Sequence, residues 1–589
     1  AIFADNEDQM IIKLTDAIKQ IVAGSLSFTA PAVMSDKQKG DFIYQSTFEY
    51  GKNIQWQGHI KKHKWDKRTG ALGAVEWDAA TLLNSRSASD RSIFTVGLTA
   101  KNLNNFTTSN RSELSKKLFQ TGVYPTTSTT PTNTEVDNFI NFIRGVDVFD
   151  EDVDSDKTET RHKLADIYHA NINIVGPVEA DATANDGTTN YLKKDNHYRA
   201  NNNYGTFRDG NTCGEVCSKR TEVVLAGSNG GILHAFDASN GKELWGFIPP
   251  NVIGKLQGII TSKANATNPI HAIDGQAVVK DIYYDNKWRT VLFSGLGAGG
   301  HGYFALDVTN IKSPKHLFAF QNDPFKSTIK FWSEDETETT YDYSGGANVA
   351  DAYDYRKLGE SWSAPRIIRI KHNNNDKWVA VVGGGYNSGV NPNYGSAVFV
   401  IDLEDGGKVL KRIDITDSAS SNIVNSVPAD LAVITADGTE KANYNGGLVY
   451  VADLEGKITK INLTDQGTMY QQTTLFNSQS NTSNGRMLFH KPDATIKNST
   501  LWMYFGSGNI QKLQDQSSNI KNRLYGIKDK DFPNFVAINS AGTISNCKTG
   551  NNCPTNNDLG WYIDLDKSKK VTAEPTVDKD LVYFPVYEP

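Results

Sequence analysis

The chain has 589 residues, which is enough for two or more domains or for one large repeat domain. Its 61 Lys and Arg residues nearly balance 67 Asp and Glu residues, for a net charge of −6, so no overall field favours nucleic acid or an anionic membrane. No window resembles the roughly 20 apolar residues of a membrane span, because the best candidate, Ile11–Ala23, is interrupted by Lys, Asp and Gln. The first residues, Ala1–Asp5, lack the features of a signal peptide, as a mature or excised fragment also would.

Helices and strands are both predicted near the start of the printed sequence. Residues Asp8–Ala23 carry apolar side chains at helical spacing and predict a helix. Aromatic, strand-like runs follow from Phe42 to about Thr95, and within them we expect Trp77–Ala80 to open a short helix.

The next stretch changes in composition. Thr107–Thr134 is rich in Thr, Ser, Asn and Pro and predicts a surface loop, and Val136–Arg144 predicts a helix. An acidic run follows that helix. We expect residues 1–165 to form an α+β extension that packs on a domain of residues 166–589.

The four cysteines fall into two close pairs, Cys213 with Cys217 and Cys547 with Cys553, each in turn-forming sequence. Two local disulfides are the simplest interpretation, although four cysteines allow three pairings. Free thiols and a metal site are alternatives, but zinc prefers tighter spacing and usually histidine. Disulfides favour an oxidising, extracytoplasmic location.

A loose repeat begins at Val223. Each unit has a β run ending in a Gly-rich turn, a second β run closing on Asp or a turn, and a third run. The units begin at Val223, Val291, Trp378, Leu448 and Trp502. This repetition predicts an all-β fold, a modified β-propeller of about seven blades with irregular insertions, because each blade buries its faces against its neighbours. A β-sandwich is the alternative, and the final strand, Asp580–Pro589, is expected to stop within the last blade.

The clearest blade carries Ala235, Asp237, Gly241 and Trp245 at fixed spacing. The Asp can accept hydrogen bonds from the following turn, the Gly tolerates a positive φ, and the Trp can stack between sheets. The motif resembles the docking motif of quinoprotein-type propellers, with Asn240 where Thr is usual. A quinone-dependent dehydrogenase of that type pairs its quinone with a vicinal disulfide, and no two cysteines here are adjacent, so we expect neither a quinone nor an enzyme.

Other catalytic and binding classes have little support. The histidines are scattered without a recognisable nucleophile. Gly297–Gly302 precedes a strand, whereas phosphate loops open helices, so no nucleotide is expected. Basic residues are dispersed, which argues against nucleic-acid binding.

A longer series of short segments runs in order from Trp56 almost to the end of the printed sequence. These segments are Trp56-Gln-Gly58, Trp77-Asp-Ala-Ala80, Arg161-His-Lys-Leu-Ala-Asp166-Ile, Asn229-Gly-Gly-Ile-Leu-His-Ala-Phe-Asp237, Phe247-Ile-Pro-Pro250, Ile273-Asp274-Gly275, Gly297-Ala-Gly-Gly-His-Gly-Tyr-Phe-Ala-Leu-Asp307-Val-Thr309, Ser361-Trp-Ser-Ala-Pro365, Val382-Gly-Gly-Gly-Tyr386, Val449-Tyr-Val-Ala-Asp453-Leu-Glu-Gly456, Tyr504-Phe-Gly506 and Gly560-Trp-Tyr562. Together they resemble the PilC/PilY family of type IV pilus-associated proteins.

The resemblance implies the C-terminal pilus-biogenesis region of such a protein, without the family's variable N-terminal part. It implies a non-enzymatic role in pilus biogenesis that opposes retraction, in twitching motility and in host-cell adhesion, often with bound calcium. The implied partners are type IV pilin subunits or the pilus tip and, through the full-length protein, a host-cell receptor. The implied location is the pilus and the outer-membrane-associated cell surface. A general periplasmic or outer-membrane scaffold propeller is the alternative.

Two segments are candidates for calcium. Asp150, Asp152, Asp154 and Asp156 place oxygens at alternate positions, as short cation-binding loops do, although the glycine and final glutamate of an EF-hand loop are missing. A solvated acidic loop is the alternative.

The second candidate comes from the resemblance. The family's usual calcium loop lies just before a strand like Val449–Ala452, where this chain is poorer in carboxylates. Asp437, Asn443 and Asn445 could supply ligands there. A hairpin turn is the alternative role.

Overall fold

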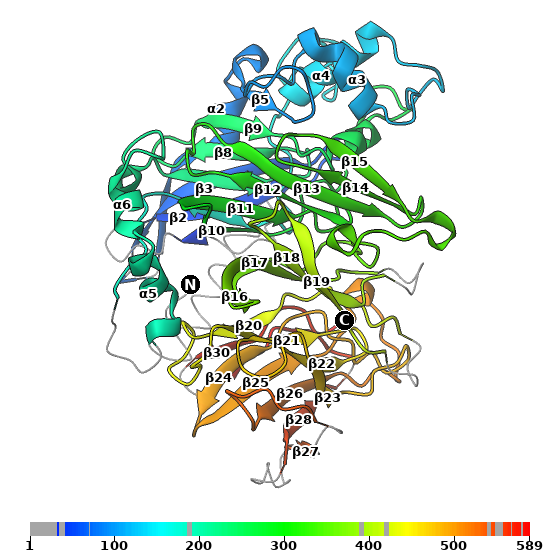
Figure 1. The fold of residues 1–589 in the computed structure, drawn as a ribbon. Coiled ribbons are helices and arrows are strands. Elements are labelled where there is room, and N and C mark those ends of the chain that lie inside the picture. The colour runs from blue at the N-terminus through cyan, green and yellow to red at the C-terminus, as the bar shows by residue number, and fades with distance from the viewer. Residues whose placement is uncertain are drawn as a thin grey trace.

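The computed structural model describes residues 32–33, 42–66, 68–69, 71–184, 191–387, 394–417, 423–538, 544–547, 558–566, 568–578 and 581–589. The helix expected at Asp8–Ala23 lies outside these residues. Within them, the strands form six sheets of four to six strands and two short pairs (Figure 1). This succession of separate sheets is the expected all-β, propeller-type architecture.

The first three sheets follow one another in the chain. Sheet one pairs β1 (Ala32–Val33), β2 (Phe42–Glu49), β3 (Gln57–Asp66) and β4 (Ala71–Asp78) in order. Sheet two has the order β5 (Ile93–Phe94), β9 (Glu243–Phe247), β8 (Leu233–Asp237), β7 (Val223–Gly227) and β6 (Ile172–Val175). Sheet three is a meander of β10 (Ala277–Tyr284), β11 (Lys287–Gly295), β12 (Gly302–Asp307), β13 (Lys315–Asp323), β14 (Thr328–Trp332) and β15 (Glu338–Asp342).

The later sheets repeat the antiparallel meander, except that the edge strand β27 (Ile544–Asn546) of sheet six pairs parallel to its neighbour. Sheet four contains β16 (Arg366–His372), β17 (Asn375–Gly383), β18 (Ala397–Asp402) and β19 (Lys408–Asp414). Sheet five contains β20 (Ala432–Thr435), β21 (Gly446–Ala452), β22 (Lys457–Thr464) and β23 (Gln472–Asn477). Sheet six has the order β24 (Asp493–Lys497), β25 (Thr500–Gly506), β26 (Arg523–Asp529), β28 (Gly560–Asp564) and β27 (Ile544–Asn546).

The last residues form two short strand pairs in place of the single final strand expected over Asp580–Pro589. β29 (Lys570–Val571) pairs with β32 (Val586–Tyr587), and β30 (Thr576–Asp578) pairs with β31 (Leu581–Tyr583). The expected strand divides at Pro585, whose nitrogen has no hydrogen to donate to a ladder. Its carbonyl accepts the Thr572 amide at 3.1 Å.

Neighbouring sheets pack face to face through hydrophobic layers. In β18, Phe399 faces sheet three, while Val398 and Val400 face sheet five, because successive side chains of a strand alternate between faces. In β21, Val449 faces sheet four and Tyr450 faces sheet six. Similar layers join sheet one to sheet two and sheet two to sheet three. Strands buried on both faces explain why the repeat reads as continuous apolar runs.

The blade motif takes the predicted structural roles. The Asp237 carboxylate accepts the Ser239 amide at 2.8 Å, and its carbonyl accepts the Gly241 amide at 2.7 Å. Gly241 has φ +72, the left-handed region that glycine tolerates. The buried Trp245 ring lies between sheets two and three and donates from Nε1 to the Ile311 carbonyl at 2.7 Å.

Among the described residues, the α-helices lie mainly in the connections between strands of sheet two, and the first of them lies between sheets one and two. They are α2 (Ala79–Asn84), α3 (Arg111–Leu118), α4 (Asn133–Arg144), α5 (Asp195–Asn201) and α6 (Tyr204–Asp209). α2 confirms the short helix expected after Trp77, and Asp78 caps it by accepting the Ala80 amide at 2.9 Å. α4 confirms the helix expected at Val136–Arg144 and begins with a capping box between Thr132 and Glu135.

The prediction of a surface loop over Thr107–Thr134 is wrong in its first half, where α3 lies. Leu114 and Leu118 stand one helical turn apart and are fully buried in the layer that also holds Phe139 of α4. Together α3 and α4 cover β5 and β9 at the top of Figure 1. Residues on both sides of position 165 share this layer, and the division into 1–165 and 166–589 stays a prediction.

Candidate metal centre

The acidic loop begins where α4 ends. Gly145 closes the helix with φ +117. Val146 and Thr160 then form a β-bridge, and the Asp147 amide donates to the Glu159 carbonyl at 3.0 Å. The two ends of the loop are therefore held side by side, which brings residues twelve positions apart into one small volume.

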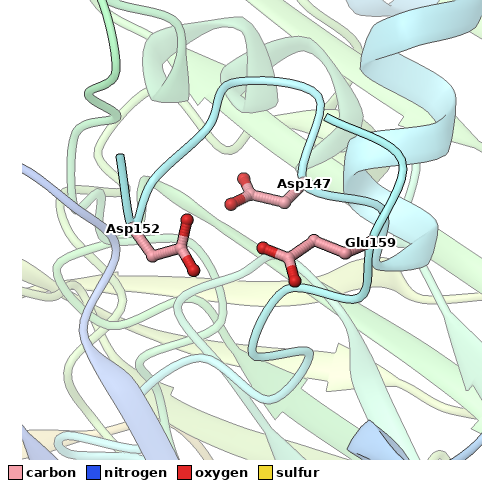
Figure 2. A group of neighbouring side chains, drawn as sticks. All are labelled: Asp147, Asp152 and Glu159. Carbon is pink, nitrogen blue, oxygen red and sulfur yellow. The ribbon is translucent and has the colours of Figure 1, made fainter. Parts of the chain in front are cut away.

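Three carboxylates meet inside this closed loop. Asp147, Asp152 and Glu159 each offer an oxygen, and these oxygens lie within 4.8 Å of one another (Figure 2). In the figure the three side chains point toward one another from opposite sides of the loop. Carboxylate oxygens at such separations are the ligands that calcium prefers.

A second, overlapping group contains three of the four aspartates predicted from the alternate spacing. Asp150, Asp152 and Asp154 also bring oxygens within 4.8 Å of one another. Asp156 belongs to neither group. Its Oδ1 accepts the amide and the hydroxyl of Thr158, at 2.9 and 2.6 Å, so its carboxylate closes a local turn.

Asp147 and Glu159 were not among the candidate ligands drawn from the sequence. Glu159 lies at the end of the acidic run Asp150–Glu159, but Asp147 lies before the start of that run and outside its alternate spacing. The available signal was the position of the run directly after a predicted helix, because a loop closed back onto that helix brings its ends together.

One carboxylate oxygen of Asp147 is available to a further ligand. The Asp147 side chain is buried, Oδ2 accepts the Glu151 amide at 2.9 Å, and Oδ1 has no hydrogen-bond partner among the described residues. Burial raises the pKa of Asp147. Partial desolvation, together with the charges of Asp152 and Asp154, raises the pKa of Glu159. Burial and the neighbouring negative charges therefore disfavour the ionised form of these carboxylates. A divalent cation among them would offset the repulsion between their charges.

The loop backbone is tightly wound and firmly anchored. Val153, a β-branched residue, has φ +67, a strained conformation that surrounding contacts must hold. Glu151 Oε2 accepts Arg161 Nε at 2.9 Å, with both side chains about nine-tenths buried. The Arg161 guanidinium also lies 4.0 Å from the centre of the Phe142 ring and donates to Gln55 Oε1 at 2.9 Å. These contacts tie the loop to α4 and to the connection between β2 and β3.

The residues of the second calcium candidate contact different parts of the protein. Asp437 Oδ1 accepts the Asp195 amide at the start of α5, at 3.0 Å. Asn445 donates from its amide and Nδ2 to Asp465, at 3.0 and 2.6 Å, and the Asn443 carbonyl accepts the Gln466 side chain at 2.9 Å. Asp465, which accepts both hydrogen bonds from Asn445, was not among the ligand candidates drawn from the sequence. Calcium at this loop stays a prediction.

The cysteines give one disulfide within the described residues. Cys213 and Cys217 are bonded, with 5.2 Å between their Cα atoms, and they pack in a small core with Tyr204, Phe207 and Trp288. This confirms the first predicted pair. Cys553 lies outside the described residues, so its pairing with Cys547 stays a prediction.

Across the part of the chain that the structure describes, we find no helix both long enough and apolar enough to span a bilayer. The stacked sheets define a β-propeller, and the acidic loop adds a candidate cation site outside the sheets. A family model described as the PilY1 beta-propeller domain matches residues 176–552, well over half of the chain. The chain therefore belongs to this family, and the resemblance to the PilC/PilY proteins is confirmed.

Individual relatives agree with this assignment. The chain is 29% identical over 472 residues to the type IV pilus biogenesis factor PilY1 of Pseudomonas aeruginosa strain UCBPP-PA14, covering 78% of this chain and 34% of the relative. It is 27% identical over 410 residues to a PilY1 homolog of Xylella fastidiosa, covering 63% of this chain and 25% of the relative. The chain thus spans about a third or less of the length of these relatives.

Among solved structures, the P. aeruginosa PilY1 C-terminal domain matches with a TM-score of 0.46 and 20% identity, over 68% of this chain and 82% of that one. The quinohemoprotein alcohol dehydrogenase of Comamonas testosteroni matches with a TM-score of 0.34 and 10% identity, over 83% of this chain and 57% of that one.

Proposed function

We propose that this chain is the propeller region of a non-enzymatic type IV pilus biogenesis protein that favours pilus extension by opposing retraction. The observation that carries the proposal is the family match over residues 176–552, together with relatives that are named type IV pilus biogenesis factors. The proposed partners are pilin subunits or the pilus tip, at the surface of the cell. Host-cell adhesion, through a receptor, and twitching motility belong to the proposal for the longer protein.

A binding role fits the local chemistry of the propeller. Asp237, Gly241 and Trp245, which resemble a quinoprotein motif, make turn and packing contacts within and between sheets. Cys213 and Cys217 are bonded to each other across three intervening residues, unlike the vicinal pair of quinone enzymes. These contacts support a structural role for the motif in a scaffold whose exposed loops present surface to partners.

We further propose that Ca²⁺ binds in the acidic loop and modulates this function. The support is the convergence of Asp147, Asp152 and Glu159, with Asp150 and Asp154 beside them, and the unsatisfied buried oxygen of Asp147. A cation held there would fix the loop against α4 and the β2–β3 connection. It would favour the conformation of the loop that a partner binds, because a ligand shifts an equilibrium toward the state it prefers. The set of Asp437, Asn443 and Asn445 is a second, separate calcium proposal.

The test of the biogenesis role is a deletion of the coding region in the source cell. Surface pili are sheared from the cells and separated from them, and their pilin is quantified by immunoblot, with total cellular pilin as the control. We expect surface pili to fall several-fold while total pilin stays constant, and re-expression of the intact gene to restore them. Unchanged piliation in a cell that retracts its pili would refute the role.

A further inference from the structure

A cavity of about 610 Å³ lies where all six large sheets meet. Its wall is made by segments that connect or precede the strands of these sheets. The segment before one strand of each sheet contributes, in the order of sheets one to six, Trp56, Tyr168, His271, Trp362, Asp430 and Phe489. The volume is in the usual range of small-ligand pockets, roughly 300–1,000 Å³. The acidic loop of residues 147–159 is not part of this wall.

Aromatic rings line two sides of the cavity. The rings of Trp362 and Tyr386 are stacked, with centroids 4.4 Å apart and planes 20° apart, and Phe489 lies 6.2 Å from Tyr386. Trp56 and Tyr168 lie 6.1 Å apart on another part of the wall. The faces of aromatic rings carry negative charge density and attract organic cations.

Two carboxylates of the wall already have cationic or potentially cationic partners. Glu574 Oε2 lies 2.6 Å from Lys491 Nζ. Asp274 accepts from His169 Nδ1 at 2.7 Å and lies 3.4 Å from His271 Nδ1. Burial alone would raise the pKa of Asp274, but the two histidines lower it to about 2.

Two further carboxylates are not balanced in this way. Glu360 Oε2 accepts Trp362 Nε1 at 3.0 Å, and Asp430 Oδ1 accepts the Ala364 amide at 2.6 Å. Neither carboxylate forms an ion pair with a lysine or arginine of the described chain. Lys255 acts on Glu360 from a distance, and its ammonium donates to the Gly299 carbonyl. Lys491 and Arg366 likewise act on Asp430 from a distance. Burial raises the pKa of both Glu360 and Asp430, as expected of carboxylates without a close counter-ion.

We propose that this central cavity binds an organic cation, an ammonium or guanidinium group on a flexible stem, between the aromatic rings and the carboxylates of Glu360 and Asp430. The carboxylates supply charge-assisted hydrogen bonds, and Trp362 and Tyr386 supply ring faces. An anionic ligand would meet the same carboxylates and be repelled. The proposal concerns a binding property of the chain and is independent of the pilus role and of the calcium loop.

Calorimetric titration of the purified chain tests the proposal. The probes are methylguanidinium, Nα-acetyl-arginine amide and the tripeptide Gly-Arg-Gly, with Nα-acetyl-glutamate amide and pyrroloquinoline quinone as anionic comparisons. We expect the cations to bind, to quench tryptophan fluorescence and to weaken as salt is raised, and the anions to bind at least tenfold more weakly. Binding of the tripeptide at least tenfold tighter than methylguanidinium identifies a polypeptide source for the cation, and equal binding identifies a free small molecule.

Variants locate the site. Glu360→Gln and Asp430→Asn keep the hydrogen-bond acceptors for Trp362 and Ala364, so each is expected to fold and to weaken the cation at least tenfold. Glu338→Gln is the matched control, because Glu338 pairs with Lys330 on the outer strands of sheet three, and it should bind as the parent does. If one variant fails to fold, the other decides. Absence of cation binding at millimolar probe, equal binding of the anions, or unchanged affinity in both variants would each overturn the proposal.

Discussion

Glu243 and Arg91 form a doubly hydrogen-bonded ion pair that is completely buried, with both Nε–Oε2 and Nη2–Oε1 at 2.9 Å. His234 Nδ1 lies 2.8 Å from Glu243 Oε1. Burial would raise the pKa of Glu243, but the Arg91 charge and the hydrogen bonds hold it well below its usual range. Arg91 also donates to the Arg144 carbonyl at 2.9 Å. The pair therefore fastens the end of α4, where the acidic loop begins, to β9 of sheet two.

Replacing Glu243 by Gln should lower the free energy of unfolding by about 3–5 kcal/mol, because it leaves the Arg91 charge buried without its partner. Urea unfolding followed by tryptophan fluorescence measures the change. Asp209→Asn is the matched control, since Asp209 makes a similar two-bonded pair with Arg208 at the surface and its loss should barely move the midpoint. Equal shifts from the two substitutions would contradict this explanation.

Calcium binding should depend on the convergent carboxylates. We expect the double variant Asp147→Asn, Asp152→Asn to bind Ca²⁺ at least tenfold more weakly in calorimetric titration, because it removes two ligand charges from the centre of the loop. Ca²⁺ at one hundred times its Kd should stabilise the parent by about 2.7 kcal/mol and raise its Tm.

Asp156→Asn serves as the matched control for that titration. Asp156 lies in the same acidic run but binds Thr158 and joins neither carboxylate group, so its variant should keep the affinity of the parent. Asp437→Asn separately tests the second calcium proposal. If the double variant binds as tightly as the parent, the acidic loop is not the site.

Asp453, a fully buried carboxyl in the turn between β21 and β22, should contribute less to stability as pH rises. Its pKa is raised from 3.8 to about 7 by burial, in spite of the nearby Lys457 ammonium at 3.5 Å. A raised folded-state pKa means that this group's stabilising contribution is complete below pH 4 and is lost as pH rises through 7. The loss should approach about 4 kcal/mol, at roughly 1.4 kcal/mol per pKa unit.

Urea unfolding of the parent and of Asp453→Asn between pH 4 and pH 8 isolates this contribution as the difference between the two profiles. The comparison is needed because burial lowers the pKa of His301, His316 and His490 to about 4, and their contributions to stability increase with pH. The free energy of unfolding of the parent should fall relative to that of Asp453→Asn as pH rises, whereas Asp405→Asn, on the exposed turn between β18 and β19, should follow the profile of the parent. A profile that is unchanged in Asp453→Asn would assign the pH dependence to other groups.

Peptide mapping without reduction should recover the disulfide Cys213–Cys217 and the predicted pair Cys547–Cys553. Replacing Cys213 and Cys217 by serine should lower the free energy of unfolding by about 2 kcal/mol, because the bond closes only a short loop. Alkylation of Cys547 in the unreduced protein would contradict the second pair.

Much of the fold follows from local patterns. The five predicted repeat starts at Val223, Val291, Trp378, Leu448 and Trp502 all fall in the second strand of an antiparallel meander, in β7, β11, β17, β21 and β25. These strands are readable because both of their faces are buried. α3 was missed because its two buried leucines are too few to give a helical pattern, and their burial depends on α4.

The residues of the candidate sites also differ in how far the sequence predicts them. The alternation of Asp150, Asp152 and Asp154 predicts their convergence, since spacing within one loop is a local property. Asp147 and Glu159 depend on the bridge between Val146 and Thr160, which spacing cannot reveal. The central cavity depends on six sheets meeting, so residues such as Glu360 and Asp430 carry no recognisable motif.

The most direct test of the central claim is the number of surface pili in cells that lack this gene, counted with and without an active retraction motor. The proposal predicts few pili when the gene alone is deleted, and pili restored when retraction is also disabled, because the protein would act against retraction. Complementation with the intact gene should restore pili in the retracting cell. If the gene deletion leaves cells without pili even when retraction is disabled, or leaves piliation unchanged when retraction is active, the claim is contradicted.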